Sequence, residues 1–403
     1  MDLDAYRARA QAFATELNGA HHRRFAGLDA RWDPEALHAR HAGLFSDAAI
    51  DGLRTATATD PALRPLLRFA VEGRLGAAAA PADARRAQAE TDEGVAAMGA
   101  ALEAEPDPGR RAALEEDRLD VVARRLTAPA AEGLERVRAQ ARALGWPSAR
   151  ALLSELRGAD LGALAAEAQA LLRATAVPVL PGAHARHDLP HVLRAAWADA
   201  VLPADPVAHL RAALRTAGLP ERFAIDAAPR PGKSPRAFCA AVTVPGDVHL
   251  VVAPRGGLPD LLALFHEAGH AVHLTHRDPA APFEARHLTD RAETEALAFA
   301  FERLATAGTG DDRVAAHLEA VELLRARHLA ATLLHGLDLL DEGPHPALRE
   351  RYARRMAAAT GLDWPSAPWL VTADPLLGSA DYLRALGRAR GLRDAQLSAA
   401  LTG

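Results

Sequence analysis

One short motif constrains this chain more than any other feature. Residues 261–276 read LLALFHEAGHAVHLTH, which contains the pattern His-Glu-x-x-His. His266 and His270 are four residues apart, so in a helix they lie one turn apart on the same face and can bind one ion. Glu267 is rotated by about 100° from His266, so its carboxylate can reach a water molecule beside the ion rather than the ion itself. The motif therefore predicts a metal-dependent hydrolase.

The residues before the motif place it in a helix that directly follows a strand. Two β-prone runs, AFCAAVTV and VHLVVAP, flank a Pro-Gly-Asp turn and predict a hairpin over residues 237–253. Gly256 and Gly257 then break the strand, and Pro259 suits the first turn of a new helix. A charged trio on an otherwise apolar helix is costly to bury without a compensating ion, so this context favours zinc.

A catalytic zinc ion takes three protein ligands and one open position, so a third ligand must come from elsewhere in the chain. His276 has the spacing of the third histidine in astacin-like enzymes, but those have a glycine where this chain has His273. We therefore expect an uninterrupted helix to carry His276 away from the ion. The next helix, expected at residues 288–304, offers Glu293 and Glu295 on opposite sides. Helical phase alone does not decide which of these two glutamates is the third ligand.

Composition excludes several classes of partner. The chain has 403 residues, of which 49% are hydrophobic and 25% charged, and its formal net charge is −5. This balance gives no electrostatic case for a nucleic-acid or membrane partner. The sequence shows neither a signal peptide nor an apolar run long enough to span a bilayer, and its single cysteine, Cys239, suits a reducing compartment. We therefore expect a cytoplasmic protein, whose oligomeric state stays open.

The organisation of the chain is mainly helical. Alanine and leucine are frequent and aromatic residues make up only 4%, which favours helix over sheet. A Pro-rich joint, VPVLPGAHARHDLP at residues 177–190, marks the expected boundary between an N-terminal helical region, 1–180, and a catalytic region, 181–403. The expected fold class is mainly α, with a small antiparallel β-sheet beside the helix that carries the motif.

Four segments resemble the thimet oligopeptidase and oligoendopeptidase F group of zinc peptidases. They are RPGKSPRAFC (230–239), VVAPRGG (251–257), LPDLLALFHEAGHAVH (258–273) and TEALAFAFE (294–302). In that group a glutamate ligand lies twenty-five residues after the second histidine, and another glutamate follows seven residues later. Those positions are Glu295 and Glu302 in this chain. The resemblance covers residues 230–385 and rests on helical texture alone in the N-terminal half.

The resemblance implies a gluzincin-type site in which His266, His270 and Glu295 bind Zn²⁺. It implies that the peptide substrate lies antiparallel to the edge strand before the zinc helix. It also implies a multi-helix, zincin-like fold that encloses a deep channel, with residues 1–180 forming part of the channel wall. Glu302 is expected to fix one of the ligand histidines in orientation.

Two features differ from that group. The chain is short for the group, so the channel wall is expected to be reduced. The group supplies a histidine and several tyrosines from a Tyr-rich segment to polarise the scissile carbonyl, whereas DPLLGSADYLRALGRA at residues 374–389 keeps only Tyr382. Tyr382 is the predicted oxyanion donor, with helix packing as an equal alternative, and His335 and His345 are weaker candidates.

Three further residues are expected close to the metal. His273 lies two helical turns from His266 on the same face, so it is expected either to orient a ligand or to contact substrate. Phe238 and Cys239 belong to the edge strand. Cys239 is expected to be a small packing residue rather than a nucleophile, because no acid–base pair is spaced to activate it.

The motif predicts a zinc hydrolase, and the resemblance implies that it is an oligopeptidase that hydrolyses short peptides. In this mechanism Glu267 takes a proton from water and later delivers it to the leaving amine. Two alternatives remain. A non-catalytic, zinc-containing scaffold is kept open by the loss of most tyrosine donors, and a zinc hydrolase of non-peptide amides would use the same metal machinery.

Overall fold

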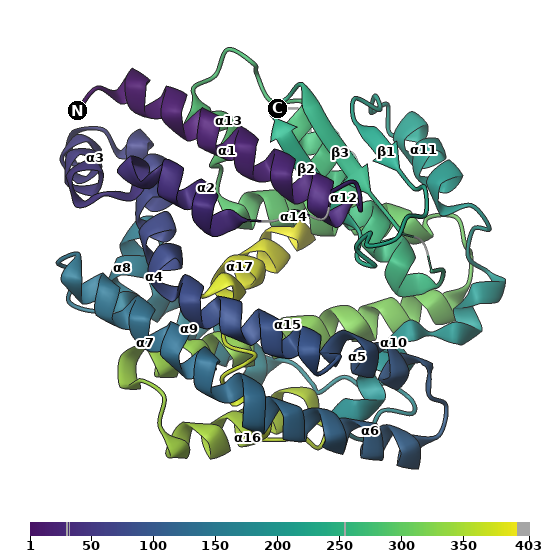
Figure 1. The fold of residues 1–403 in the computed structure, drawn as a ribbon. Helices are drawn as coiled ribbons and strands as arrows, with labels where there is room; N and C mark the ends of the chain where they lie inside the picture. The colour runs from purple at the N-terminus through teal and green to yellow at the C-terminus, as the bar shows by residue number, and fades with distance from the viewer. Residues whose placement is uncertain (30, 32, 254, 393–403) are drawn as a thin grey trace. The chain divides into compact units, whose positions relative to one another are not determined.

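The computed structural model describes residues 1–403 except for 30, 32, 254 and 393–403. The chain is mainly helical and has a small sheet of three strands, as the sequence predicts (Figure 1). It divides into two compact units. The first combines Met1–Val71, Ala196–Asp311 and the chain from Arg384 onward, and the second combines Glu72–Ala195 with Asp312–Leu383. The sequence predicts one boundary, near residue 180. Each of the two units instead combines segments that lie far apart in the sequence.

The first unit contains the predicted metal-binding motif. Its helices are α1 (Leu3–Phe25), α2 (Pro34–Arg40), α3 (Asp47–Thr59), the start of α4 (Arg64–Asp92), α11 (Pro206–Thr216), α12 (Leu258–Thr275), α13 (Phe283–His287), α14 (Arg291–Glu302) and the end of α17 (Gly378–Gly391). The motif helix, α12, starts within one residue of the position that the glycine and proline signals predict.

The sheet of the first unit has the strand order β1-β3-β2. Strands β2 (Phe238–Thr243) and β3 (Asp247–Val251) pair antiparallel, which confirms the predicted hairpin. Strand β1 (Ala224–Asp226) pairs with β3 in parallel and was not predicted. Strand β2 therefore lies at the edge of this sheet.

The two faces of the sheet are covered by different helices. Cys239 pairs with Leu250 across the hairpin, and side chains of opposite residues share a face, so both point to the same side. That side packs into an apolar core with Leu264 and Phe265 of α12. The neighbouring residue Phe238 points to the opposite side.

On that opposite side the sheet meets α1. The ring of Phe238 lies edge-on to His21, with 5.4 Å between the ring centroids, and the ring of His249 stacks on His22 at 4.0 Å. The sheet therefore lies between α1 and α12, an arrangement that Figure 1 shows with α1 in purple. Because both faces are covered, polar groups of the hairpin remain accessible mainly at the outer edge of β2.

Helices α12 and α14 pack closely because small residues meet at their interface. A methyl group on Gly269 of α12 would lie only 3.0 Å from the Cα atom of Ala298 on α14. Ala268, Ala298 and Ala300 are completely buried. This close approach lets short side chains on the two helices reach one another.

The regular elements of the second unit are helices in its described residues, apart from one isolated β-bridge between Ala185 and Asp363. The helices are most of α4, α5 (Val95–Ala104), α6 (Pro108–Val121), α7 (Thr127–Ala143), α8 (Ala149–Arg157), α9 (Leu161–Ala174), α10 (Leu189–Arg194), α15 (Asp312–Glu342), α16 (Pro346–Thr360) and the start of α17. A buried ion pair at 2.7 Å joins Arg111 of α6 to Asp188, the residue before α10. Among the residues that the structure describes, no helix is both long and apolar enough to cross a membrane.

Candidate metal centre

Three side chains from α12 and α14 converge on one point. Nε2 of His266 lies 3.3 Å from Oε2 of Glu295, and Nε2 of His270 lies 3.8 Å from the same oxygen. The three potential ligand atoms all lie within 4.8 Å of one another. Within the described part of the chain, no other three His, Cys, Asp or Glu side chains meet this criterion.

The donor set fits a divalent transition metal. Two imidazole nitrogens and one carboxylate oxygen are the ligand types of catalytic zinc sites, and other first-row metals accept the same set. The three side chains are only 16–17% exposed, so a cation between them would offset the cost of burying the carboxylate. Glu293, the alternative that helical phase left open, is exposed at the opposite side of α14. The geometry therefore brings Glu295, not Glu293, to the two histidines.

Glu302 orients the first histidine. Nδ1 of His266 donates a hydrogen bond to Oε1 of Glu302 at 2.8 Å, which leaves Nε2 of the ring facing Glu295. The ring of Phe299 packs against the same imidazole, with 5.3 Å between the centroids. Both contacts restrict rotation of the ring, so its Nε2 lone pair has a fixed direction.

The two histidines differ in electrostatic environment. Burial by itself lowers the pKa of His266, but the neighbouring carboxylates of Glu295 and Glu302 outweigh burial and raise it to about 9. For His270 burial prevails and lowers the pKa to about 4. The two glutamates therefore stabilise a positive charge mainly at His266. A bound cation would replace the proton at this position.

Glu267 faces the edge strand rather than the two glutamates of α14. Its Oε2 accepts a hydrogen bond from the backbone N–H of Cys239 at 2.9 Å. Burial raises the pKa of the Glu267 carboxyl, although the charge of His266 and this hydrogen bond oppose the shift. The carboxylate is thus fixed between the histidine pair and the outer edge of β2, and a raised pKa suits a group that exchanges protons near neutral pH.

The other histidines of α12 are not part of the three-residue group. His273 is buried, and its Nε2 contacts the guanidinium of Arg277. His276 lies just beyond the last residue of the helix, where its Nδ1 contacts the carbonyl oxygen of Val272 at 2.7 Å. The helix continues without a break through His273. As the sequence predicts, this uninterrupted helix carries His276 away from the histidine pair.

The predicted oxyanion donor belongs to the second unit. Tyr382 is 40% exposed, and its role stays a prediction. Of the weaker candidates in the same unit, His335 is buried with Nε2 beside the carbonyl oxygen of Trp369 at 2.7 Å. His345 lies on the surface, 3.1 Å from Glu342. The contacts of these two histidines are therefore structural.

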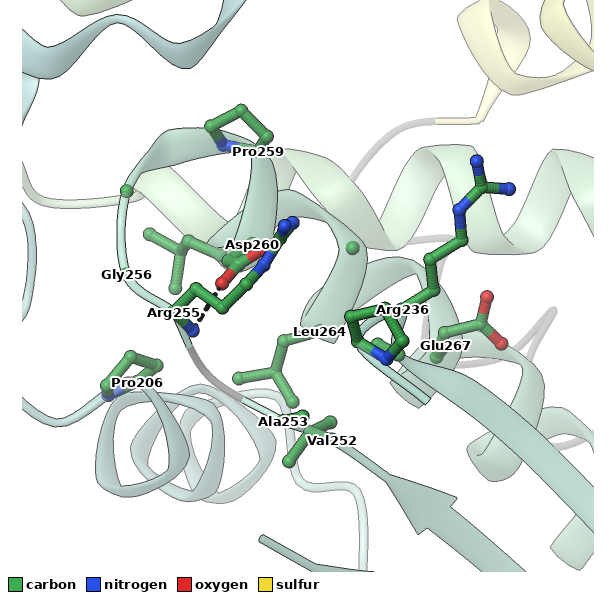
Figure 2. A pocket seen from close by; sticks show the side chains of 15 residues that line it. Pro206, Arg236, Val252, Ala253, Arg255, Gly256, Pro259, Asp260, Leu264 and Glu267 are labelled. Atoms are coloured by element: carbon green, nitrogen blue, oxygen red, sulfur yellow. Dashed lines mark hydrogen bonds and ion pairs between the residues drawn. The ribbon is translucent and has the colours of Figure 1, made fainter. Parts of the chain in front are cut away.

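A cavity of about 350 Å³ opens beside Glu267, between the end of the hairpin and the first turns of α12. Figure 2 shows Leu264, Val252 and Ala253 on its floor and Arg236 on the same side as Glu267. The sequence alone did not identify Arg236 as a candidate site residue. The only available signal was a long basic side chain among small residues just before the edge strand.

Comparisons with known proteins identify the fold. No protein-family model and no curated protein matches the chain. A solved structure assigned as an oligoendopeptidase F is 14% identical, covers 98% of this chain and 78% of its own, and has a TM-score of 0.53. Another, from Bacillus anthracis, is 13% identical over 97% and 75% of the two chains, with a TM-score of 0.50. Trypanosoma cruzi metallocarboxypeptidase 1 is 16% identical over 99% and 85%, with a TM-score of 0.46.

At identities this low, the likeness establishes the fold and not the family. The two oligoendopeptidase F structures match nearly the whole chain, including the N-terminal half, for which the sequence offered only helical texture. The expected fold class is confirmed: the chain has a mainly helical, metallopeptidase-like fold with a small sheet beside the helix that carries the His-Glu-x-x-His motif.

Proposed function

We propose that this chain is a zinc-dependent peptidase that hydrolyses short peptides. One observation carries the proposal: His266, His270 and Glu295 converge while Glu267 lies between them and the edge strand. Ligands and a proton-transfer group in this arrangement are the parts that metal-assisted hydrolysis requires. The shared fold with oligoendopeptidase F structures supports the peptide as substrate.

Each residue has a distinct task in the proposed mechanism. His266, His270 and Glu295 would hold Zn²⁺, which when bound lowers the pKa of water toward about 7 and polarises the substrate carbonyl. Glu267 accepts the water proton on its carboxylate and returns it to the leaving amine. Glu302 keeps the His266 ring in position, and the Cys239 N–H keeps the Glu267 carboxylate in position.

The edge of β2 is the expected place for the peptide backbone. An extended peptide can add to a free strand edge through main-chain hydrogen bonds, and the Glu267 carboxylate lies at this edge. Asn18 of α1 already occupies part of it, because its Nδ2 donates to the carbonyl oxygen of Ala241 at 2.8 Å. We therefore expect the peptide to pair with the part of β2 near Cys239, through groups other than the Cys239 N–H, which binds Glu267.

A length series of quenched fluorescent peptides tests the proposal. The zinc-loaded protein is expected to cleave peptides, and Glu267→Gln is expected to lose about 10²-fold or more in kcat while its zinc content, measured by mass spectrometry, stays unchanged. Glu293→Gln is the matched control, because this exposed glutamate lies on α14 outside the three-residue group.

Three outcomes would contradict the proposal. Cleavage that survives Glu267→Gln would show that this carboxylate is not the base. A protein that binds one zinc ion and cleaves no peptide would favour the scaffold alternative, and cleavage of amides other than peptides would favour the second alternative.

A further inference from the structure

We propose that the cavity beside Glu267 selects peptides with a carboxylate close to the cleaved bond, and that Arg236 recognises this carboxylate. The inference rests on the proposed peptidase function and adds a substrate class to it. Arg236 would be a specificity-determining residue, since it contacts the substrate without taking part in the proton transfers.

The cavity is placed to receive a substrate side chain. Glu267 forms part of its wall, so an occupant lies next to the site of proton transfer. The rest of the lining is largely apolar, and a methyl group on Gly256 would meet no atom within 4 Å. A cavity of about 350 Å³ with few polar groups has the size and character of a small-ligand pocket.

The lining contains two arginines, Arg236 and Arg255, and two carboxylates, Asp260 and Glu267. Asp260 accepts a hydrogen bond from the backbone N–H of Arg255 at 2.6 Å and pairs with its guanidinium at 3.3 Å, so these two side chains largely neutralise each other. Among the described residues, the guanidinium of Arg236 has no hydrogen-bond or ion-pair partner, and the side chain is exposed. The second carboxylate of the lining, Glu267, accepts the backbone N–H of Cys239, so Arg236 is the lining cation whose hydrogen-bond donors are left for a substrate.

The backbone at Arg236 is fixed by hydrogen bonds, whereas its guanidinium has no partner in the part of the chain that the structure describes. The N–H of Arg236 donates to Oγ of Ser234 at 3.2 Å, and that hydroxyl donates to the carbonyl oxygen of Arg236 at 3.0 Å. Strand β2 begins two residues later, at Phe238. The guanidinium therefore extends from an anchored point on the same side of the cavity as Glu267 (Figure 2).

A carboxylate is the group that this arrangement recognises best. A guanidinium presents planar, parallel N–H donors that match the two oxygens of a carboxylate. In a peptide that carboxylate has two sources: the side chain of Asp or Glu, or the free C-terminus. A lysine or arginine side chain in the same place would be repelled by Arg236.

The test uses peptides that are identical except for Glu, Gln or Lys at each position flanking the cleaved bond, each made with a free or an amidated C-terminus. The zinc-loaded wild type is expected to prefer the carboxylate-bearing peptide by about tenfold in kcat/KM. Arg236→Gln should abolish this preference, and Arg236→Glu should shift it toward Lys. A preference that follows Glu identifies an acidic side chain as the ligand, and one that follows the free acid identifies the C-terminus.

The matched control is Arg222→Gln. Arg222 is also an exposed arginine of the first unit, with no partner among the described residues, and it lies outside the cavity lining. This variant removes the same charge and should keep the wild-type preference. No carboxylate preference in the wild type, or an equal loss of preference in Arg222→Gln and Arg236→Gln, would overturn the inference.

A binding measurement separates the inference from the proposed function. Fluorescence anisotropy of labelled peptides on zinc-loaded Glu267→Gln, with and without Arg236→Gln, needs no turnover. If no peptide is cleaved by the wild type but carboxylate-bearing peptides still bind better through Arg236, the peptidase proposal fails and the recognition site stands. If peptides are cleaved while binding shows no such preference, the recognition site is wrong and the peptidase proposal stands.

Discussion

His266 is held from both sides by glutamates of the same neighbouring helix. Its Nδ1 donates to Oε1 of Glu302 at 2.8 Å, while its Nε2 lies 3.3 Å from Oε2 of Glu295. The two glutamates are seven residues apart on α14, so they lie on one face and the imidazole fits between them. One glutamate can thus act as a ligand while the other fixes the ring.

Removal of Glu302 is expected to weaken zinc binding without removing a ligand. Glu302→Ala should lower zinc affinity by about 10–100-fold, because the His266 ring loses its hydrogen-bond acceptor and part of its basicity. Glu302→Gln keeps an acceptor and should fall between this variant and the wild type. Competition with a chromophoric chelator measures the affinity, with Glu293→Ala as the control. Equal affinities of Glu302→Ala and Glu293→Ala would show that the contact has no role in metal binding.

The close packing of α12 and α14 gives a second prediction. In Gly269→Ala, the new methyl group would lie 3.0 Å from both the Ala298 Cα and the Phe301 Cβ, so the helices must move apart. We expect the free energy of unfolding to fall by about 1–3 kcal/mol, and zinc affinity to fall as well because Glu295 moves away from the histidines. Denaturant titration and chelator competition measure the two effects.

Gly387→Ala is the matched control for this prediction. Gly387 lies in α17, where an added methyl group would meet no atom within 4 Å. Alanine is a better helix former than glycine by about 1 kcal/mol, so this variant should be slightly more stable and should bind zinc normally. If Gly269→Ala behaved like Gly387→Ala, the helix spacing would not determine the geometry of the ligands.

The sequence predicts the elements around the site well because local signals define them. Glycine and proline mark the start of α12, and alternating β-prone residues mark the hairpin. Local signals did not decide whether Glu293 or Glu295 is the third metal ligand. Helical phase could not decide it, because both faces of α14 carry apolar residues, and only the resemblance to a peptidase group favoured Glu295.

Other features depend on contacts between distant segments and leave no local pattern. Strand β1 has three residues, and only its pairing with β3 makes it a strand. The hydrogen bond from Cys239 to Glu267 involves the backbone, so side-chain patterns do not reveal it. The units likewise combine stretches more than a hundred residues apart. The role of Tyr382 stays a prediction, as do those of Phe238 and His273.

The thiol of Cys239 is expected to be chemically inert. Burial raises its pKa, and the negative charge of Glu267 adds to the shift, so the reactive thiolate is scarce at neutral pH. Iodoacetamide should label Cys239 only after denaturation, as mass spectrometry would show. Cys239→Ala keeps the backbone N–H that binds Glu267, so peptide cleavage should stay within about twofold of the wild type. A large loss of cleavage in Cys239→Ala would instead give the side chain a role in the mechanism.

An ion-pair cluster at the start of α14 is expected to make stability depend on pH. Asp290 lies 2.8 Å from Arg384 and 3.0 Å from Arg388 of α17, and it caps α14 by accepting the Ala292 N–H at 3.0 Å. Burial tends to raise the pKa of Asp290, but the two arginines and this hydrogen bond outweigh burial and lower it below its usual value. A carboxylate with a lowered folded-state pKa stabilises the protein above its unfolded-state pKa, and this contribution is lost as pH falls through the folded-state value.

Asp290→Asn isolates the charge, because asparagine is an equally good helix cap. The variant should be less stable than the wild type by about 1 kcal/mol at pH 7, and the difference should shrink below pH about 4. Urea titrations at pH 7, 5 and 3 measure it. Asp278→Asn is the control: Asp278 accepts a backbone N–H from Ala280 at 2.9 Å and, among the described residues, has no ion-pair partner. A destabilisation by Asp290→Asn that stays constant from pH 7 to 3 would mean that the shape of the Asp290 side chain, and not its charge, stabilises the contact between α14 and α17.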